Sequence, residues 1–219
     1  MTMTRLVILA NSLKRGDLCL AGIDLETGKW VRPVTTLDDG RVPKKSMKIF
    51  PALLDVVEIP LAATGPDFGF ECENRTILPG PWRNAGALTM ADLDKYIEQP
   101  RVVLHNQKKS VAPSELRQKP FEERRTLQLI RVENFRVYDA RAVPFDKPNW
   151  KGIVLSGGQE IEAGITDPVY IQKLGKGHVP SPSCVLTMSL SMPYAPPGWT
   201  GAEALCWKLI AAVLEISEV

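Results

Sequence analysis

The amino-terminal segment of the chain holds side chains suited to binding anions and stacking on bases. Asn11, Lys14 and Arg15 lie between two apolar runs, and Trp30 and Arg32 lie on a third. Amide and cationic side chains in a turn can contact phosphate oxygens or base edges. Trp30 and Arg32 share one face of a strand, so the indole would stack on a base while the guanidinium holds a phosphate or a guanine-like edge. The alternative packs the indole in the core and buries the apolar stem of the arginine.

A second basic segment, rich in glycine, lies in the C-terminal half. Residues 173–178 read Lys-Leu-Gly-Lys-Gly-His, with Lys176 between the two glycines. The spacing differs from that of a P-loop, and no helix is predicted to follow. We therefore expect Lys176 to contact an anion from a loop, and the alternative is an ordinary solvated loop.

The sequence contains none of the common motifs of serine hydrolases, zinc proteases or zinc deaminases. Its two histidines, His105 and His178, form no ligand pair, and the four cysteines are too widely spaced for a zinc site. We predict reduced, mostly buried thiols, and no metal, cofactor or catalytic residue. Asp and Glu are numerous, so carboxylate-based nuclease chemistry remains an alternative.

The composition is that of a globular protein able to bury a core. Of the 219 residues, 44% are hydrophobic and 24% are charged, and the length suits one large domain or two small ones. The apolar runs fall short of the roughly 18 residues that indicate a membrane span. The first residues lack the apolar core of a signal peptide. We therefore expect a cytoplasmic protein without a membrane partner.

The net charge of +2 is small, but the charges are unevenly distributed. Residues 1–50 carry nine Lys and Arg against five Asp and Glu, and residues 101–151 carry twelve against six. The intervening and final segments are acidic. Two basic segments that converge on one face would form an electrostatic footprint for a polyanion, whereas scattered charges would not.

Short strands dominate the predicted secondary structure. Apolar runs bounded by turn residues predict strands at 6–10, 18–23, 30–34, 53–61, 127–137, 153–155, 160–163, 165–171 and 184–192. Glu133 and Asn134 predict a bulge or bend in the fifth of these. Residues 205–216 suit either a helix or a strand. We favour a strand because they follow another strand through a turn rich in Pro and Gly.

Helix patterns are few, and they leave a β-rich chain of two lobes. Thr89 followed by Asp92 predicts a capped helix, and a second short helix begins at Ser114. We predict lobes at residues 1–100 and 126–219, with 101–125 as a connector. The strands at 54–60 and 185–193 both alternate and both end at a proline, which is consistent with two related lobes.

The opening segment also resembles a known family. Residues 8–14 read I-L-A-N-S-L-K, residues 19–22 read C-L-A-G, and residues 28–34 read G-K-W-V-R-P-V. This is similar to the start of the bacterial dual OB-containing domain (DuOB) family, close to A-N-S-R-K, C-I-A-G and G-x-W-I-R-P-V. Thr187-x-Ser189-Leu190 and residues 208–211 are similar to its closing strands. Leu13 departs from the pattern, since arginine is more common there, and the change removes a cationic contact.

The resemblance implies two OB-like barrels and a nucleic-acid or nucleotide-binding role in bacterial conflict or defence systems, and it carries over no catalytic residues. We therefore predict a mainly β protein with two OB-like small β-barrels and a few short helices. Its expected partner is single-stranded or modified nucleic acid, or a nucleotide. The predicted binding residues are Asn11, Lys14, Arg15, Trp30, Arg32 and Lys176. The alternatives are a nucleotide-processing or nuclease-type enzyme, and an accessory protein-interaction module that uses residues 66–82.

Overall fold

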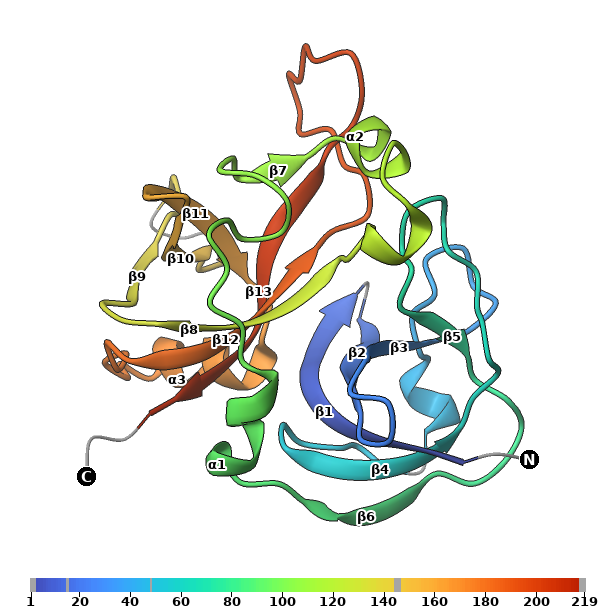
Figure 1. Ribbon diagram of the computed structural model, residues 1–219. Helices are drawn as coiled ribbons and strands as arrows, with labels where there is room; N and C mark the ends of the chain where they lie inside the picture. Colours follow the sequence, from blue (N-terminus) through green and yellow to red (C-terminus); the bar gives the residue numbers. More distant parts are fainter. Residues whose placement is uncertain (1–2, 15, 48, 144–146, 217–219) are drawn as a thin grey trace. The chain divides into compact units, whose positions relative to one another are not determined.

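The computed structural model describes residues 3–14, 16–47, 49–143 and 147–216. The chain divides into two compact units, Met1–Tyr96 (the N-terminal unit) and Ile97–Val219 (the C-terminal unit). Each unit is built on a mixed β-sheet with a few short helices (Figure 1). The predicted mainly β fold is therefore confirmed. Residues 101–125 lie within the C-terminal unit, and their role as a connector stays a prediction.

The described residues of the N-terminal unit form six strands. They are β1 (Met3–Lys14), β2 (Asp17–Asp24), β3 (Trp30–Val34), β4 (Asp55–Pro60), β5 (Asn74–Thr76) and β6 (Arg83–Ala87). Their order in the sheet is β5-β3-β2-β1-β4-β6. The first three strands form an antiparallel meander, β4 pairs back onto β1, and β5 pairs in parallel with β3.

Beyond β4 and β5 the N-terminal unit continues to pair. Leu61 forms an antiparallel bridge with Ile77. The Ala62 N–H donates to the Thr76 carbonyl at 2.9 Å, and the Leu78 N–H donates to the Pro60 carbonyl at 2.9 Å. The segments that follow the fourth and fifth strands therefore approach each other, although the named strands of each sheet form an open path within the described residues.

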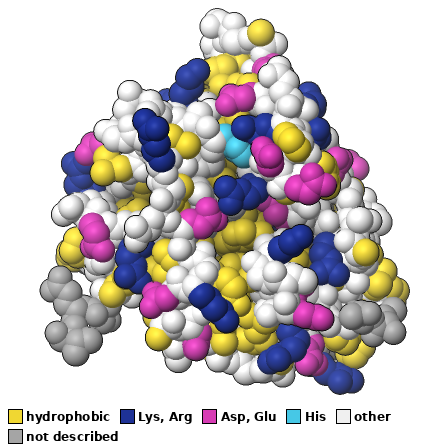
Figure 2. All heavy atoms as spheres, viewed as in Figure 1, with side chains coloured by type: hydrophobic (Ala, Val, Ile, Leu, Met, Phe, Trp, Pro, Cys, Tyr) yellow, Lys and Arg dark blue, Asp and Glu magenta, His cyan; other side chains and the backbone are white. Residues whose placement is uncertain are grey.

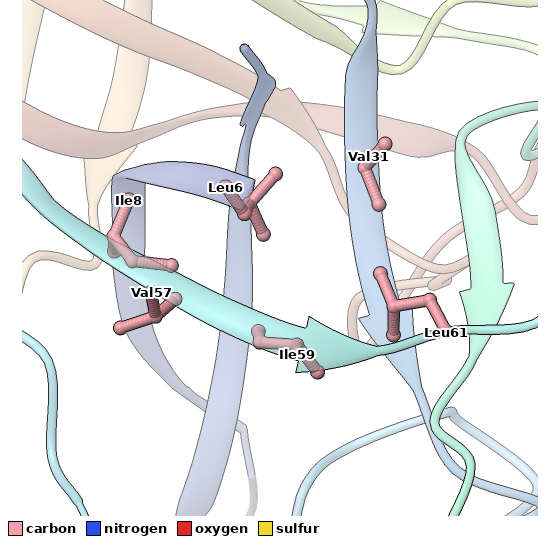
Figure 3. Close-up of a cluster of buried hydrophobic side chains, with 6 residues drawn as sticks. All are labelled: Leu6, Ile8, Val31, Val57, Ile59 and Leu61. Atoms are coloured by element: carbon pink, nitrogen blue, oxygen red, sulfur yellow. The ribbon is translucent and has the colours of Figure 1, made fainter. Parts of the chain in front are cut away.

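A cluster of aliphatic side chains forms a core of the N-terminal unit. Figure 3 shows Leu6 and Ile8 from β1, Val31 from β3, and Val57, Ile59 and Leu61 from β4 and the residue after it. The spacing of two residues within each strand places these side chains on one face of the sheet. Burying each contributes roughly 1.5–3 kcal/mol relative to leaving it exposed. This packing explains why the alternating pattern of the sequence folds as strands here.

Seven strands are described in the C-terminal unit. They are β7 (Ser110–Val111), β8 (Leu127–Val132), β9 (Arg136–Asp139), β10 (Trp150–Ser156), β11 (Gln159–Ile165), β12 (Cys184–Leu190) and β13 (Cys206–Glu215). Their order is β8-β12-β13-β11-β10-β9, with β7 on β13. β8 and β9, at opposite ends of this path, are consecutive strands joined only by residues 133–135. Asn134 has a φ of 58°, which confirms the predicted bend, and β13 confirms the predicted strand at 205–216.

The two units share one connectivity. In the C-terminal unit, the bent strand β8–β9 with β10 and β11 forms the meander, β12 pairs back onto β8, and β13 pairs in parallel with β11. β4 and β12 therefore occupy equivalent places, and these are the two proline-terminated strands that resemble each other in sequence. The observation supports two structurally related lobes.

Helices are short throughout. They are η1 (Lys44–Ser46), α1 (Met90–Leu93), η2 (Asp94–Tyr96), α2 (Pro113–Arg117), η3 (Phe121–Glu123) and α3 (Pro168–Gly175). The capping box of Thr89 and Asp92 at α1 is confirmed. The predicted strand at 165–171 is wrong, because α3 begins at Pro168. Asp167 caps this helix by accepting from the N–H groups of Val169 and Tyr170, each at 3.0 Å, and proline suits the first helical position.

Candidate nucleic-acid interface

β1 carries two of the six predicted binding residues, Asn11 and Lys14. Asn11 is half-buried in β1 opposite Leu20, and its amide Nδ2 donates to the Pro51 carbonyl at 2.7 Å. Lys14 ends β1, where its backbone pairs with Asp17. The Lys14 side chain and all of Arg15 lie outside the described residues. Asn11 therefore ties the strand to a neighbouring loop, and the roles of the two cations stay predictions.

Arg32 is placed inside the protein. It lies on the face of β3 opposite the core residue Val31 and is 5% exposed, with its Nη1 2.6 Å from Oε1 of Glu71. The other Glu71 oxygen accepts from Nδ2 of Asn74 at 2.6 Å. Burial by itself lowers the pKa of Arg32, but the carboxylates of Glu71 and Glu73 outweigh burial and raise it. The guanidinium therefore holds the 71–74 segment over β3. The sequence alone could not show that a carboxylate about forty residues away in the chain covers this arginine.

Trp30 and Lys176 lie in different units. Trp30 is half-buried at the start of β3, where it pairs with Ile23. Lys176 is exposed just after α3, and its N–H donates back to the Lys173 carbonyl at 3.0 Å. The loop that follows is anchored, since Nε2 of His178 lies 2.8 Å from both carboxylate oxygens of Glu215.

A cluster that the sequence analysis did not single out lies beside the start of β13. We call Tyr194, Trp199, Trp207 and Lys109 the aromatic surface. The rings of Trp199 and Trp207 meet edge to face, with centroids 5.9 Å apart and an interplanar angle of 77°. The ammonium of Lys109 lies 5.6 Å from the Trp207 ring centroid, within the range of a cation–π contact. Tyr194 and Trp199 are 55% and 37% exposed.

Hydrogen bonds fix the aromatic surface from within the C-terminal unit. Nε1 of Trp207 donates to the Tyr194 carbonyl at 2.9 Å, and Nε1 of Trp199 donates to the Glu203 carbonyl at 3.0 Å. β7 pairs with the first residues of β13, which sets Lys109 next to Trp207. Both indole N–H groups are thus committed to the protein. A ligand would therefore meet these rings through their π faces. The sequence feature that could have indicated this surface is a turn rich in Pro and Gly with three aromatic residues in and after it.

Two open cavities lie beside the strands of the same unit. One, of about 440 Å³, is lined by Lys109 and Gln107 together with Ile153, Glu160 and Glu162 of β10 and β11. It links the aromatic surface to the outer face of those strands. The other, of about 600 Å³, extends over β8 and β9 to Arg131 and Arg136.

Charges on the outer face of β9, β10 and β11 are balanced. Arg136 pairs with Glu160, and the Tyr138 hydroxyl donates to Glu162. Figure 2 shows basic and acidic side chains interspersed over the displayed face rather than gathered by sign. A ligand on these strands would therefore gain more from stacking and apolar contact than from a strong positive field.

Two further features of the described residues bear on the alternative functions. Within the described residues, no group of three or more His, Cys, Asp and Glu is arranged to hold a metal ion. No described helix is long and apolar enough to cross a membrane. Part of the 66–82 stretch is internal, since Phe70 is fully buried and Trp82 packs against the core cluster.

The two sheets share one connectivity, and the sheet of the C-terminal unit carries aromatic residues in the loop between its last two strands. These features define a protein of two OB-like units. The sequence agrees, because residues 4–213 match the model of the dual OB-containing domain, DuOB. The chain belongs to this family, as its opening motif predicts. No curated protein and no solved structure matches the chain. OB folds bind oligonucleotides and oligosaccharides on the face of their second and third strands and on the loops L12 and L45.

Proposed function

We propose that the protein binds single-stranded nucleic acid on the C-terminal unit, with the aromatic surface as the principal contact. The main observation in support is the edge-to-face pair of Trp199 and Trp207, with the ammonium of Lys109 over the Trp207 ring. In the shared connectivity, β10 and β11 are the second and third strands, and residues 191–205 form the loop between the fourth and fifth. The aromatic surface therefore lies where OB folds contact their ligands.

Single strands suit this surface better than duplex. Their unstacked bases expose π faces that can stack on aromatic side chains, which contributes about 1–3 kcal/mol per base. Exposed Tyr194 and Trp199 offer such faces, and Lys109 supplies a cation for the backbone. The adjoining cavity continues the track over Ile153. The balanced charges of that face favour bases over phosphates as the main source of affinity.

Fluorescence polarisation with labelled DNA and RNA strands of about 12 nucleotides, within the site sizes of single OB folds, tests the proposal. Trp199→Ala should weaken binding roughly 5- to 150-fold, the equivalent of one lost stacking contact. Phe121→Ala is the matched control. Phe121 is 43% exposed in the same unit and also lies beside a cation, the guanidinium of Arg124 at 5.8 Å.

Trp30→Ala, measured in parallel, distinguishes the aromatic surface from the predicted N-terminal hairpin. A loss with Trp30→Ala and none with Trp199→Ala would move the site to the hairpin and refute the aromatic surface. Absence of binding to every DNA and RNA strand tested would refute the function itself.

A further inference from the structure

A small pocket in the C-terminal unit brings together two guanidinium groups and an imidazole. It has a volume of about 250 Å³ and is lined by Arg101, His105 and Arg125, with Gln128 and the apolar side chains of Leu104 and Leu127 beside them. The described lining residues include no carboxylate. Arg101 and the Arg125 side chain are exposed, so a ligand can reach both from solvent.

The backbone beside this pocket is strained. Leu104 and His105 have φ values of 42° and 79°, in the left-handed region that favours glycine. A conformation of this kind costs about 1–3 kcal/mol for a residue other than glycine, and it persists only where the surrounding structure enforces it. The surrounding structure must therefore hold this turn in place.

Three hydrogen bonds enforce the strained turn. The N–H of Leu104 donates to Oε1 of Gln128 at 3.0 Å, and the preceding N–H donates to Oγ of Ser156 at 2.9 Å. Nε2 of His105 lies 2.6 Å from the Arg125 carbonyl. Because a carbonyl only accepts, Nε2 carries the hydrogen, and burial lowers the pKa of His105, so Nδ1 of the neutral ring is left to accept from a hydroxyl of a phosphate or sugar. These bonds hold the imidazole beside the backbone of Arg125 before any ligand arrives.

The orientation of Gln128 is also fixed by its surroundings. Its Nε2 donates to Glu98 Oε2 at 3.0 Å, so its Oε1 must face the Leu104 N–H. The same Glu98 carboxylate lies 3.3 Å from Nη1 of Arg125. One carboxylate thus positions both the amide that holds the turn and one of the two guanidinium groups.

We propose that this pocket binds a phosphomonoester. Guanidinium groups present planar arrays of donors that match phosphate oxygens, and charge-assisted bonds of this kind are about twice as strong as neutral ones. At roughly 30 Å³ per water molecule, the pocket has the volume of about eight waters, which is enough for a phosphoryl group and an attached sugar. The proposal uses none of the residues of the aromatic surface and does not depend on binding there.

Isothermal titration calorimetry of the full chain with inorganic phosphate tests the pocket. Arg101→Ala and Arg125→Gln should each weaken phosphate binding at least about tenfold, the effect of one lost charge-assisted hydrogen bond. Arg125→Gln retains a donor for Glu98, and the hydrogen bond from His105 ends on the backbone, so the turn is preserved. His105→Asn should also weaken binding, and asparagine tolerates the left-handed conformation.

Arg83→Ala is the matched control, since Arg83 is an exposed arginine in β6 of the other unit. Absence of phosphate binding to the wild-type chain would overturn the proposal. Equal phosphate affinity in Arg101→Ala, Arg125→Gln and Arg83→Ala would also overturn it.

A second set of ligands distinguishes free nucleotides from strand ends. Tighter binding of a 5′-phosphorylated oligonucleotide than of its 5′-hydroxyl counterpart would identify a strand end as the source of the phosphate. Binding of a 5′-mononucleotide without this preference would identify a small ligand. Trp199→Ala should leave inorganic phosphate binding unchanged, so failure of the aromatic surface and failure of this pocket are separately visible.

Discussion

Lys208 should make the stability of the C-terminal unit depend on alkaline pH. This residue lies in β13 and is 2% exposed, and its ammonium donates to the carbonyl and to Oδ1 of Asn106 at 2.6 and 3.1 Å. Burial lowers its pKa from 10.5 to about 8, and the charge of Glu115 opposes the shift only in part. The folded chain therefore holds this proton less tightly than the unfolded chain.

The sign and size of the effect follow from proton linkage. Between about pH 8 and pH 10.5 the unfolded chain binds more protons at this site, so the free energy of unfolding rises with pH across that window. The pKa difference of about 2.5, at 1.36 kcal/mol for each pKa unit, corresponds to about 3 kcal/mol. Below about pH 8 the buried ammonium stays charged and lowers the free energy of unfolding by this full amount, and above about pH 10.5 this destabilisation is absent.

Lys208→Met isolates this contribution. Both Asn106 oxygens keep another donor in the variant, the Ser156 hydroxyl at 2.8 Å and the Lys108 N–H at 3.0 Å. Urea unfolding of both proteins from about pH 7 to pH 10.5 gives the difference in unfolding free energy at each pH. We expect wild type to gain about 3 kcal/mol relative to the variant across this range. A difference that stays constant would refute the reasoning, and Lys208→Gln repeats the measurement with a donor retained.

Three further predictions concern the N-terminal ion pair, the cap of α3 and the proposed ligand. Arg32→Met should destabilise the chain by about 3–5 kcal/mol in urea unfolding, because it leaves the buried Glu71 carboxylate without its guanidinium, and a wild-type midpoint would contradict this. Asp167→Ala should cost about 1–2 kcal/mol of unfolding free energy or more, because it removes both the cap and the acceptor of the Val213 N–H. Asp167→Asn keeps one oxygen for the cap but loses the acceptor for Val213, so it should restore only part of the loss; equal losses in the two variants would count against the capping role. Oligonucleotide affinity should fall only gently with salt, with a logarithmic slope of about −1.4 for two neutralised phosphates, and a slope steeper than about −4 in the polarisation assay would point to a far more basic site.

The strands could be predicted from sequence because their side chains alternate between a packed face and its opposite. Residues 160–163 show this directly, because Ile161 and Ala163 are buried while Glu160 and Glu162 are exposed. Residues 205–216 became a strand because a buried central position tolerates apolar side chains on both faces. Helix α3 was missed because Ile165 and Ile171 continue an apolar pattern across Asp167-Pro168. The cap and the proline, rather than periodicity, decide where the helix begins.

The candidate site was harder to predict than the strands. The sequence pattern around Arg32 is the same whether the side chain faces a ligand or an internal carboxylate. Only the fold brings Glu71 next to it. The aromatic surface combines Lys109, just before β7, with rings that lie about ninety residues further along the chain, so no local pattern contains it. The strained turn at Leu104 and His105 is equally hidden, because it depends on side chains from β8 and β10.

The place of β13 between β11 and β12 has a consequence for synthesis on the ribosome. This strand is made after the other described strands of the C-terminal unit, and it also carries the short strand β7, so the sheet of that unit lacks its middle until residues 206–215 have emerged. Until then, β11 and β12 each expose an unpaired edge, a state that favours aggregation. Nascent chains stalled before β13 should therefore need chaperones, whereas the N-terminal unit can assemble while the rest is still being translated.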